Sequence, residues 1–263
     1  MEKFITAAGT ATRYSSFGIG EKVILLIHGY LEAIEIWDSF AGKLGKQYKV
    51  IAVDLPGSGW SDFGGKTAIT MEFMADVIYD VLQKEGVSKC TVIGHSMGGY
   101  ASLALAKNYP DVVEKLVLMH SSPYGDTPEK KEHRQREIEI IKQGKKELLS
   151  RLNPTRGFAK ENVRRCVDTI EELAEQIMIT EDDAIVATLE GMMLREDNCE
   201  FFAQAKFPRL MIFGTEDNYI PLELAQKMIE SFPTAEHVII ESAGHMSFIE
   251  QPDKTLEVIS NFV

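Results

Sequence analysis

Cysteine is scarce in this sequence. The three cysteines, Cys90, Cys166 and Cys199, are odd in number and widely separated. A disulfide framework or a zinc site would need more sulfur ligands at closer spacing. We therefore expect reduced thiols and no structural metal site.

Positive charge is also in short supply. The 28 Lys and Arg residues face 40 Asp and Glu residues, which gives a formal net charge of −12. Nucleic acids and anionic membranes are bound by basic clusters, so neither is an expected partner. The longest aliphatic run, Val23 to Ile27, is far too short to span a bilayer. Residues 1–16 lack the basic start and apolar stretch of a signal peptide, and these absences together favour a cytoplasmic protein.

What the sequence does contain is an alternation of short apolar segments with amphipathic ones. This alternation predicts an α/β fold, with a mostly parallel central sheet covered by helices on both faces. At 263 residues, one domain or a domain with one insertion is expected. The predicted strands are residues 3–7, 11–17, 23–28, 48–53, 90–95, 113–119, 209–213 and 237–241. The predicted helices of this part are residues 33–45, 70–86, 97–109, 221–231 and 246–262.

The alternation stops at Ser121 and resumes after Lys206. Residues 121–206 contain no convincing buried strand and are helical and charged in character. We therefore expect a core made of residues 1–120 and 207–263, with residues 121–206 as an α-helical insertion that is not an independent domain. The helices predicted inside the insertion are residues 129–143, 144–151, 159–178, 181–194 and 197–205.

One motif organises the rest of the chain. Residues 94–98 read Gly-His-Ser-Met-Gly, and they lie between a β-branched strand and an amphipathic helix. The two glycines leave room for a strained strand-to-helix turn, because a Cβ at either place would crowd a neighbouring element. This context favours Ser96 as an exposed nucleophile over a turn serine without chemistry.

A serine nucleophile needs a base, and position decides among six histidines. His245 follows the last strand in a glycine-bearing loop, at the same end of the sheet as Ser96. The other five are weaker candidates that shape loops or are structural or solvated, with His120 ranked above the rest because it ends a strand: His28, His95, His120, His133 and His237.

The base in turn needs a carboxylate that holds its imidazole in one tautomer. Asp217 follows the strand at residues 209–213 and lies between the serine and the histidine in sequence, as this arrangement requires. Glu216 is the adjacent competitor, and Asp126 is a weaker rival further along the chain. The backbone N–H groups of Met97 and Tyr30 are the expected donors of an oxyanion hole.

Cofactor chemistry finds no support in the sequence. No two histidines have the helical or hairpin spacing of metal ligands, and no glycine-rich phosphate loop of the required form is present. We therefore expect neither a metal nor any other cofactor.

These motifs together resemble those of the α/β-hydrolase fold family, in the serine-nucleophile group with a helical cap between the sixth and seventh core strands. The matching segments run in the family order over nearly the whole chain: residues 28–30, 54–61, 94–99, 214–217 and 244–245. The resemblance implies a Ser96–His245–Asp217 triad. Haloalkane dehalogenases and epoxide hydrolases of this fold carry an aspartate where Ser96 stands, and proline iminopeptidases usually carry a tryptophan where Met97 stands.

The resulting prediction is a carboxylesterase-like hydrolase that cleaves a small or medium apolar ester through an acyl-enzyme on Ser96. C–C bond hydrolases, lyases, thioesterases and perhydrolases of the same fold remain alternatives, and a non-catalytic ligand-binding member is a further one. The expected partner is a small-molecule ester-like substrate. The residues expected to bind it are apolar or aromatic and lie near the nucleophile or on the insertion: Tyr30, Trp37, Met97, Met192 and Met193.

Overall fold

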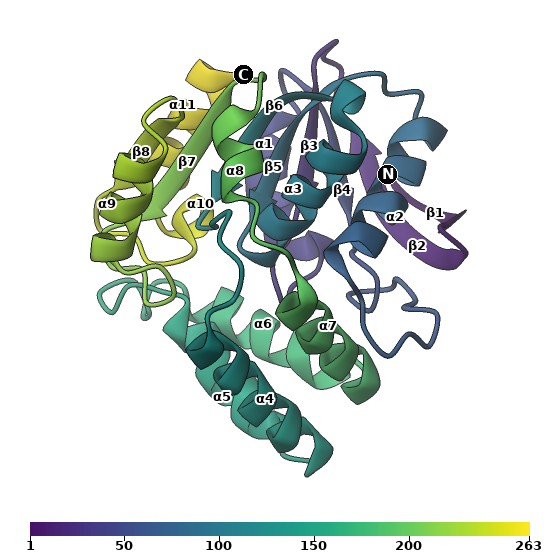
Figure 1. The fold of residues 1–263 in the computed structure, drawn as a ribbon, viewed down its shortest axis with the longest axis vertical. Helices are drawn as coiled ribbons and strands as arrows, with labels where there is room; N and C mark the ends of the chain where they lie inside the picture. The colour runs from purple at the N-terminus through teal and green to yellow at the C-terminus, as the bar shows by residue number, and fades with distance from the viewer.

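The strands predicted from the apolar segments form a single eight-stranded sheet. A computed structural model describes residues 1–263, and the strand order across its sheet is β1-β2-β4-β3-β5-β6-β7-β8 (Figure 1). Strand β2 pairs antiparallel with both β1 and β4, and all the other pairs are parallel. The strands are β1 Glu2–Ala7, β2 Thr10–Phe17, β3 Val23–Ile27, β4 Lys49–Val53, β5 Cys90–His95, β6 Val113–Met119, β7 Arg209–Gly214 and β8 Glu236–Ile240.

Helices cover both faces of this sheet, as predicted. The helices outside the 121–206 segment are η1 Ile34–Trp37, α1 Asp38–Leu44, α2 Met71–Lys84, α3 Met97–Asn108, η2 Pro110–Val112, α9 Leu222–Ser231, α10 Ser247–Glu250 and α11 Pro252–Phe262. Alternate residues of β3 point to opposite faces, so Leu25 joins a core of 43 buried residues and Leu26 joins one of 24. Helices α2, α3 and α9 pack in the larger core, and α1 and α11 pack in the smaller.

The final predicted helix is in fact two helices. The prediction of one helix over 246–262 is wrong, because α10 ends at Glu250 and α11 begins at Pro252. Proline has no N–H and disfavours the helical conformation in the residue before it. Gln251 accordingly has φ −133° and ψ 58°, outside the helical region.

Residues 121–206 form five helices and no strand: α4 Pro128–Lys142, α5 Lys146–Arg156, α6 Val167–Ile179, α7 Asp182–Leu194 and α8 Cys199–Gln204. The helix predicted from residue 159 begins only at Val167. Asn162 explains the delay, because its side-chain amide donates to the Ser242 carbonyl and to Glu250, both at 2.8 Å. These tertiary contacts hold residues 159–166 in turns.

Helices α4–α7 lie together at one end of the sheet (Figure 1). They contact loops that follow several strands. The hydroxyl of Tyr30 donates to Glu137 of α4 at 3.0 Å, and the backbone N–H of Ile69 donates to Ala187 of α7 at 2.8 Å. The backbone N–H of His245 donates to the carbonyl of Gly157 at 2.7 Å. Helix α8 lies apart from these four, beside the sheet, where Phe202 packs on Phe232 with ring centroids 5.1 Å apart.

The structure bears on two features that the sequence analysis considered, the state of the cysteines and membrane-spanning segments. The three cysteines are unpaired, with Cys90 and Cys166 buried and Cys199 partly buried. None of the helices combines the length and the apolar character that crossing a bilayer requires.

Candidate active site

Ser96 occupies a strained turn between β5 and α3. Its backbone has φ 51° and ψ −116°, a conformation that non-glycine residues rarely adopt. A Cβ at Gly94 would come within 2.3 Å of Ser102 Oγ, and one at Gly98 within 2.2 Å of the Ile27 carbonyl oxygen. The glycine requirement predicted from the motif is therefore met at both positions. Ser96 itself is partly exposed, whereas both of its neighbours are buried.

His245 and Asp217 meet at the same end of the sheet. Asp217 Oδ2 lies 2.8 Å from His245 Nδ1. A carboxylate can only accept, so Nδ1–H donates and the lone pair of Nε2 is left free. The other carboxylate oxygen of Asp217 accepts from the backbone N–H groups of Tyr219 and Ile220, at 2.8 and 2.9 Å.

The two rival carboxylates lie elsewhere. Glu216 is exposed, whereas Asp217 is only 4% exposed. The carboxylate of Asp126 is fully buried and paired with Arg134 and Arg195, at 2.6 and 2.7 Å. It therefore joins α4 to the end of α7 and does not contact a histidine.

Asp217 stays ionised despite its burial. Burial alone would raise the pKa of this carboxyl, but the charge of His245 and hydrogen bonds from both His120 and His245 hold the pKa well below the ordinary range. A buried carboxylate with four donors is thus preorganised to stabilise an imidazolium at His245.

His120 is the histidine whose position the sequence underrated. Its Nδ1 lies 3.0 Å from the same Asp217 oxygen that His245 contacts, and its Nε2 lies 2.8 Å from Ser247 Oγ. The only sequence signal was its place at the end of a strand. Its contact with Asp217 depends on the pairing of β6 with β7, which brings the ends of these two strands side by side.

A second missed residue is Glu32, which connects three loops. Its carboxylate accepts from the Gly29 backbone N–H at 2.6 Å and pairs with His95 Nδ1 at 3.0 Å. His95 Nε2 in turn lies 2.9 Å from the His245 carbonyl oxygen. Burial would lower the pKa of His95, but the charge of Glu32 raises it above the ordinary histidine value. His95 therefore shapes loops, as predicted, by means of a buried ion pair.

Glu250 holds the loop that carries His245. Its side chain is completely buried and accepts from the backbone N–H groups of Gly244 and Met246, at 2.8 and 3.2 Å. It also accepts from the Ala159 N–H at 2.8 Å, which ties this loop to the 121–206 segment. No local pattern singled Glu250 out, because it lies in what reads as an ordinary terminal helix.

The predicted nucleophile and base are not hydrogen-bonded to each other in this structure. Neither the Ser96 hydroxyl nor His245 Nε2 has a partner in the protein, and the contact between their loops runs through His95. Catalytic hydrogen bonds in enzymes without substrate are often long and tighten in the complex. The backbone N–H groups of Met97 and Tyr30 likewise meet no protein acceptor.

The residues expected to bind substrate divide into two groups. Tyr30 and Met193 are partly exposed, whereas Trp37, Met97 and Met192 are each 1% exposed. Trp37 packs against Phe248 with ring centroids 4.4 Å apart and an interplanar angle of 33°, in the smaller core. Met97 and Met192 belong to the larger core. A contact of these residues with substrate stays a prediction.

Two histidines and a carboxylate lie close enough together to be compared with a metal site. One side-chain atom each of His120, Asp217 and His245 lies within 4.8 Å of the others. Both Nδ1 atoms, however, donate to the same Asp217 oxygen, and Ser247 occupies Nε2 of His120. This is the pattern of a hydrogen-bonded acid–base system, with one nitrogen free.

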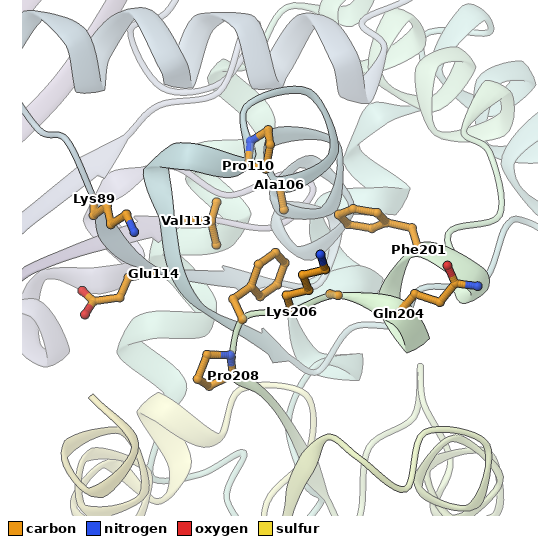
Figure 2. A pocket seen from close by; sticks show the side chains of 11 residues that line it. Lys89, Ala106, Pro110, Val113, Glu114, Phe201, Gln204, Lys206 and Pro208 are labelled. Atoms are coloured by element: carbon orange, nitrogen blue, oxygen red, sulfur yellow. The ribbon is translucent and has the colours of Figure 1, made fainter.

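A groove of about 610 Å³ lies elsewhere on the molecule (Figure 2). It is lined by residues at the start of β6, after α8 and at the end of α3, among them Val113, Phe207 and Ala106. None of the predicted site residues lines it. Because parallel strands expose their catalytic loops at their carboxyl ends, this groove is at the wrong edge of the sheet for that chemistry.

Two relatives that match almost the full length of this chain are hydrolases. It is 27% identical to the 2-hydroxy-6-oxononadienedioate/2-hydroxy-6-oxononatrienedioate hydrolase of Paraburkholderia phymatum, over 98% of this chain and 93% of that protein. It is 24% identical to the pimeloyl-acyl-carrier protein methyl ester esterase of Aeromonas hydrophila, over 94% of this chain and 97% of that one.

Solved structures give the same fold. A thermophilic esterase from Thermogutta terrifontis, solved with malate bound, superposes with a TM-score of 0.91 at 27% identity, covering 99% of this chain and 97% of that one. The enol-lactonase of Burkholderia xenovorans superposes with a TM-score of 0.89 at 20% identity, covering 99% of both chains.

Family models match both halves of the core. One that describes the alpha/beta hydrolase fold matches residues 22–143, and one described as TAP-like protein matches residues 195–262. These ranges contain the turn at Ser96 and the loops of Asp217 and His245. The chain therefore has the α/β-hydrolase fold.

Proposed function

We propose that this α/β hydrolase is a serine esterase for small or medium apolar carboxylic esters, with Ser96 as nucleophile, His245 as general base and Asp217 as the acid that orients His245. The observation that carries the proposal is the buried 2.8 Å contact of His245 Nδ1 with Asp217 Oδ2, which leaves Nε2 free at the end of the sheet where Ser96 is partly exposed. A free imidazole nitrogen that a serine hydroxyl can reach is what activation of that hydroxyl requires.

In the proposed acylation step, Ser96 Oγ attacks the ester carbonyl carbon and its proton passes to Nε2 of His245. The positive charge that forms on the imidazole is stabilised by the ionised Asp217. The carbonyl oxygen becomes an oxyanion, which accepts from the Met97 and Tyr30 backbone N–H groups. His245 then gives the proton to the leaving alkoxide, and the alcohol departs.

In deacylation, the same groups act on water. His245 Nε2 takes a proton from a water molecule, whose oxygen attacks the acyl carbon. The second tetrahedral intermediate collapses when Ser96 Oγ leaves and recovers its proton from His245. The products are the carboxylic acid and the unmodified enzyme, so the cycle needs no cofactor.

Helices α4–α7 are proposed to be a cap over this site. Their contacts with Tyr30, Ile69 and His245 support this, because those residues lie in loops after different strands. A cover of this kind limits the size of the ligand beside Ser96. Helix α8 packs with the core, so the proposed cap is smaller than the full 121–206 insertion.

A C–C bond hydrolase is the second candidate, and the Paraburkholderia relative favours it. The same triad can serve both reactions, so the residues do not separate them. Substrate choice would then rest on groups around the triad. Thioesterase, lyase and perhydrolase activities share the residues as well, but no observation favours them.

Two measurements test the proposal. A fluorophosphonate probe should label the wild-type protein and fail to label Ser96→Ala. A panel of p-nitrophenyl esters, acyl thioesters, lactones and a 2-hydroxy-6-oxo-dienoate then ranks the reactions by kcat/KM. Highest kcat/KM on a short ester supports esterase activity. Turnover of the dienoate alone would replace it with the C–C hydrolase, and an unlabelled wild-type protein would leave a ligand-binding role.

A further inference from the structure

His120 directly follows β6 and has a positive φ. Its φ of 50° lies in the left-handed region, which few non-glycine residues occupy, asparagine, aspartate and histidine being the most frequent of them. Its side chain has no exposed surface. The surroundings of a buried polar residue hold it in such a conformation, so any role of His120 is exerted through its contacts.

Both nitrogens of the His120 ring are engaged. Nδ1–H donates to Asp217 Oδ2 at 3.0 Å, because a carboxylate oxygen can only accept. Nε2 then accepts from the Ser247 hydroxyl at 2.8 Å. Ser247 is itself fully buried, and its hydroxyl has no other partner. The tautomer of His120 is therefore fixed from both sides.

The hydrogen bonds of His120 are those of a neutral ring, with one donor nitrogen and one acceptor nitrogen. Burial lowers the pKa of His120 to about 4, although Asp217 acts in the opposite direction. A second cation beside Asp217 would compete with the charge that forms on His245, whose ring lies 5.4 Å away. A neutral donor lets Asp217 keep its charge for His245.

Asp217 consequently divides its hydrogen bonds in a defined way. Oδ1 accepts two backbone N–H groups, and Oδ2 accepts the two histidine N–H groups. Each donor stabilises the negative charge and makes the carboxylate less basic. The donor from His120 also lies on the oxygen that faces His245, so it fixes that oxygen directly.

Other charged groups surround the pair from the remaining loops. His95 pairs with Glu32 and lies 4.9 Å from the His245 ring. The ring centroids of Tyr219 and His245 lie 4.8 Å apart. The guanidinium carbon of Arg156 lies 4.8 Å from the centroid of the Tyr219 ring. Glu250 accepts from the backbone on either side of His245. Among these groups, only His120 and His245 donate from a side chain to Asp217.

We propose that His120 is a positioning residue for the hydrolytic reaction, which acts by holding Asp217 Oδ2 in line with His245 and by limiting the basicity of that carboxylate. The inference rests on the proposed function. His120 does not touch the substrate, so its effect passes through Asp217 to His245.

The test compares donor-free and donor-bearing variants on p-nitrophenyl butyrate. His120→Gly accepts a positive φ without strain, and His120→Ala repeats the removal without added backbone freedom. In His120→Asn the side-chain Nδ2 takes the place of the ring Nδ1, because both atoms are bonded to Cγ, and asparagine tolerates positive φ. The readouts are kcat, KM and the pH dependence of kcat/KM.

Without the donor from His120, Asp217 Oδ2 is no longer held in line with His245. Both donor-free variants should therefore lower kcat about tenfold, as for the loss of one hydrogen bond to a charged group, with KM within about twofold. Loss of the donor also makes Asp217 more basic and strengthens its attraction for the imidazolium, so the acid limb of kcat/KM should move to higher pH by about half a unit or more. His120→Asn should restore the limb to its wild-type position and kcat to within about threefold.

The matched control is His28→Ala, which removes another fully buried histidine at a strand end. His28 contacts the Leu55 N–H and the Gly29 carbonyl and makes no contact with Asp217. The acid limb of kcat/KM of the His28→Ala variant should therefore keep the wild-type position. The inference is overturned by a wild-type limb in both donor-free variants, by an equal shift in His28→Ala, or by an asparagine variant as impaired as the glycine one. If wild-type turnover itself survives Ser96→Ala, the proposed function fails instead.

Discussion

Strands β5 and β7 bury their residues in a different way from helices α4 and α6. Every residue of β5 and of β7 is buried, whereas α4 buries only Ile138 and Ile141, and α6 only Leu173 and Ile177. These interior strands thus have an apolar pattern that specifies their own packing. Helices α4 and α6 have exposed, charged faces, whereas α7 buries seven of its residues. This difference fits the proposal that the core supplies the chemistry and that helices α4–α7 form a cover over the site.

The largest expected effect tests whether the chemistry belongs to the core. Ser96→Ala should lower ester kcat/KM by about 10³-fold or more, since the oxyanion donors alone remain, while the melting temperature is unchanged. Steady-state rates and circular dichroism measure this. Ser39→Ala, at an exposed position of α1, is the matched control. Retention of most turnover in the Ser96 variant would remove Ser96 from the mechanism.

The next effect compares two adjacent carboxylates of the loop after β7. Asp217→Asn should cost about 10²-fold or more in kcat, because the amide can no longer stabilise the imidazolium. Glu216→Gln should stay within about twofold, since Glu216 is exposed and has no contact with a histidine. Both variants are measured with the same ester. The reverse order of losses would show that the acid is assigned to the wrong residue.

A third experiment tests how the cover is held. Asp126→Asn leaves Arg134 and Arg195 without their buried carboxylate, so the free energy of unfolding should fall by about 3 kcal/mol. Urea denaturation measures the change, with the exposed Asp168→Asn on α6 as control. A loss as small as that of the control would mean that α4 and α7 are held by apolar packing instead.

Substrate length tests the role of the cover directly. Each methylene buried beside Ser96 adds up to about 0.8 kcal/mol until the site is full. We expect kcat/KM to rise from acetyl to about butyryl or hexanoyl esters and to fall before palmitoyl. Helix α4 presents charged residues to solvent, among them Glu129, Lys131 and Glu132, so no activation at an oil–water interface is expected. A preference for triglyceride emulsions would contradict this and indicate a lipase.

The smallest expected effect is the pH dependence of the stability that Glu85 contributes. Burial would raise the pKa of Glu85, but hydrogen bonds from Lys3, Lys49, Ser16 and Tyr14 lower it from 4.5 to about 2. The stability this group contributes is complete above pH 4.5 and is lost as pH falls toward 2. Glu85→Gln should therefore be less stable than wild type at pH 7, and the gap should narrow in acid. A constant gap from pH 7 to pH 2.5 would rule out ionisation as its cause.

The strands and the turn at Ser96 were predictable because their signals are local. The continuous apolar runs of β3 and β5 and the glycines on either side of Ser96 each specify a conformation within a few residues. Helix bounds inside the insertion were less predictable. Residues 159–166 read as helix, but contacts of Asn162 with Ser242 and Glu250 override that propensity.

The sequence by itself determined the fold class and the three residues proposed for catalysis, since each follows a recognisable strand. Only the tertiary structure decided which groups support them. His120, Glu32 and Glu250 each contact a partner far away in the sequence: Asp217, His95 and Ala159, respectively. The contacts of His120 and Glu32 form because parallel strands end at one edge of the sheet. The packing of Trp37 against Phe248 was likewise visible only in the tertiary structure, because its partner is far away in the sequence.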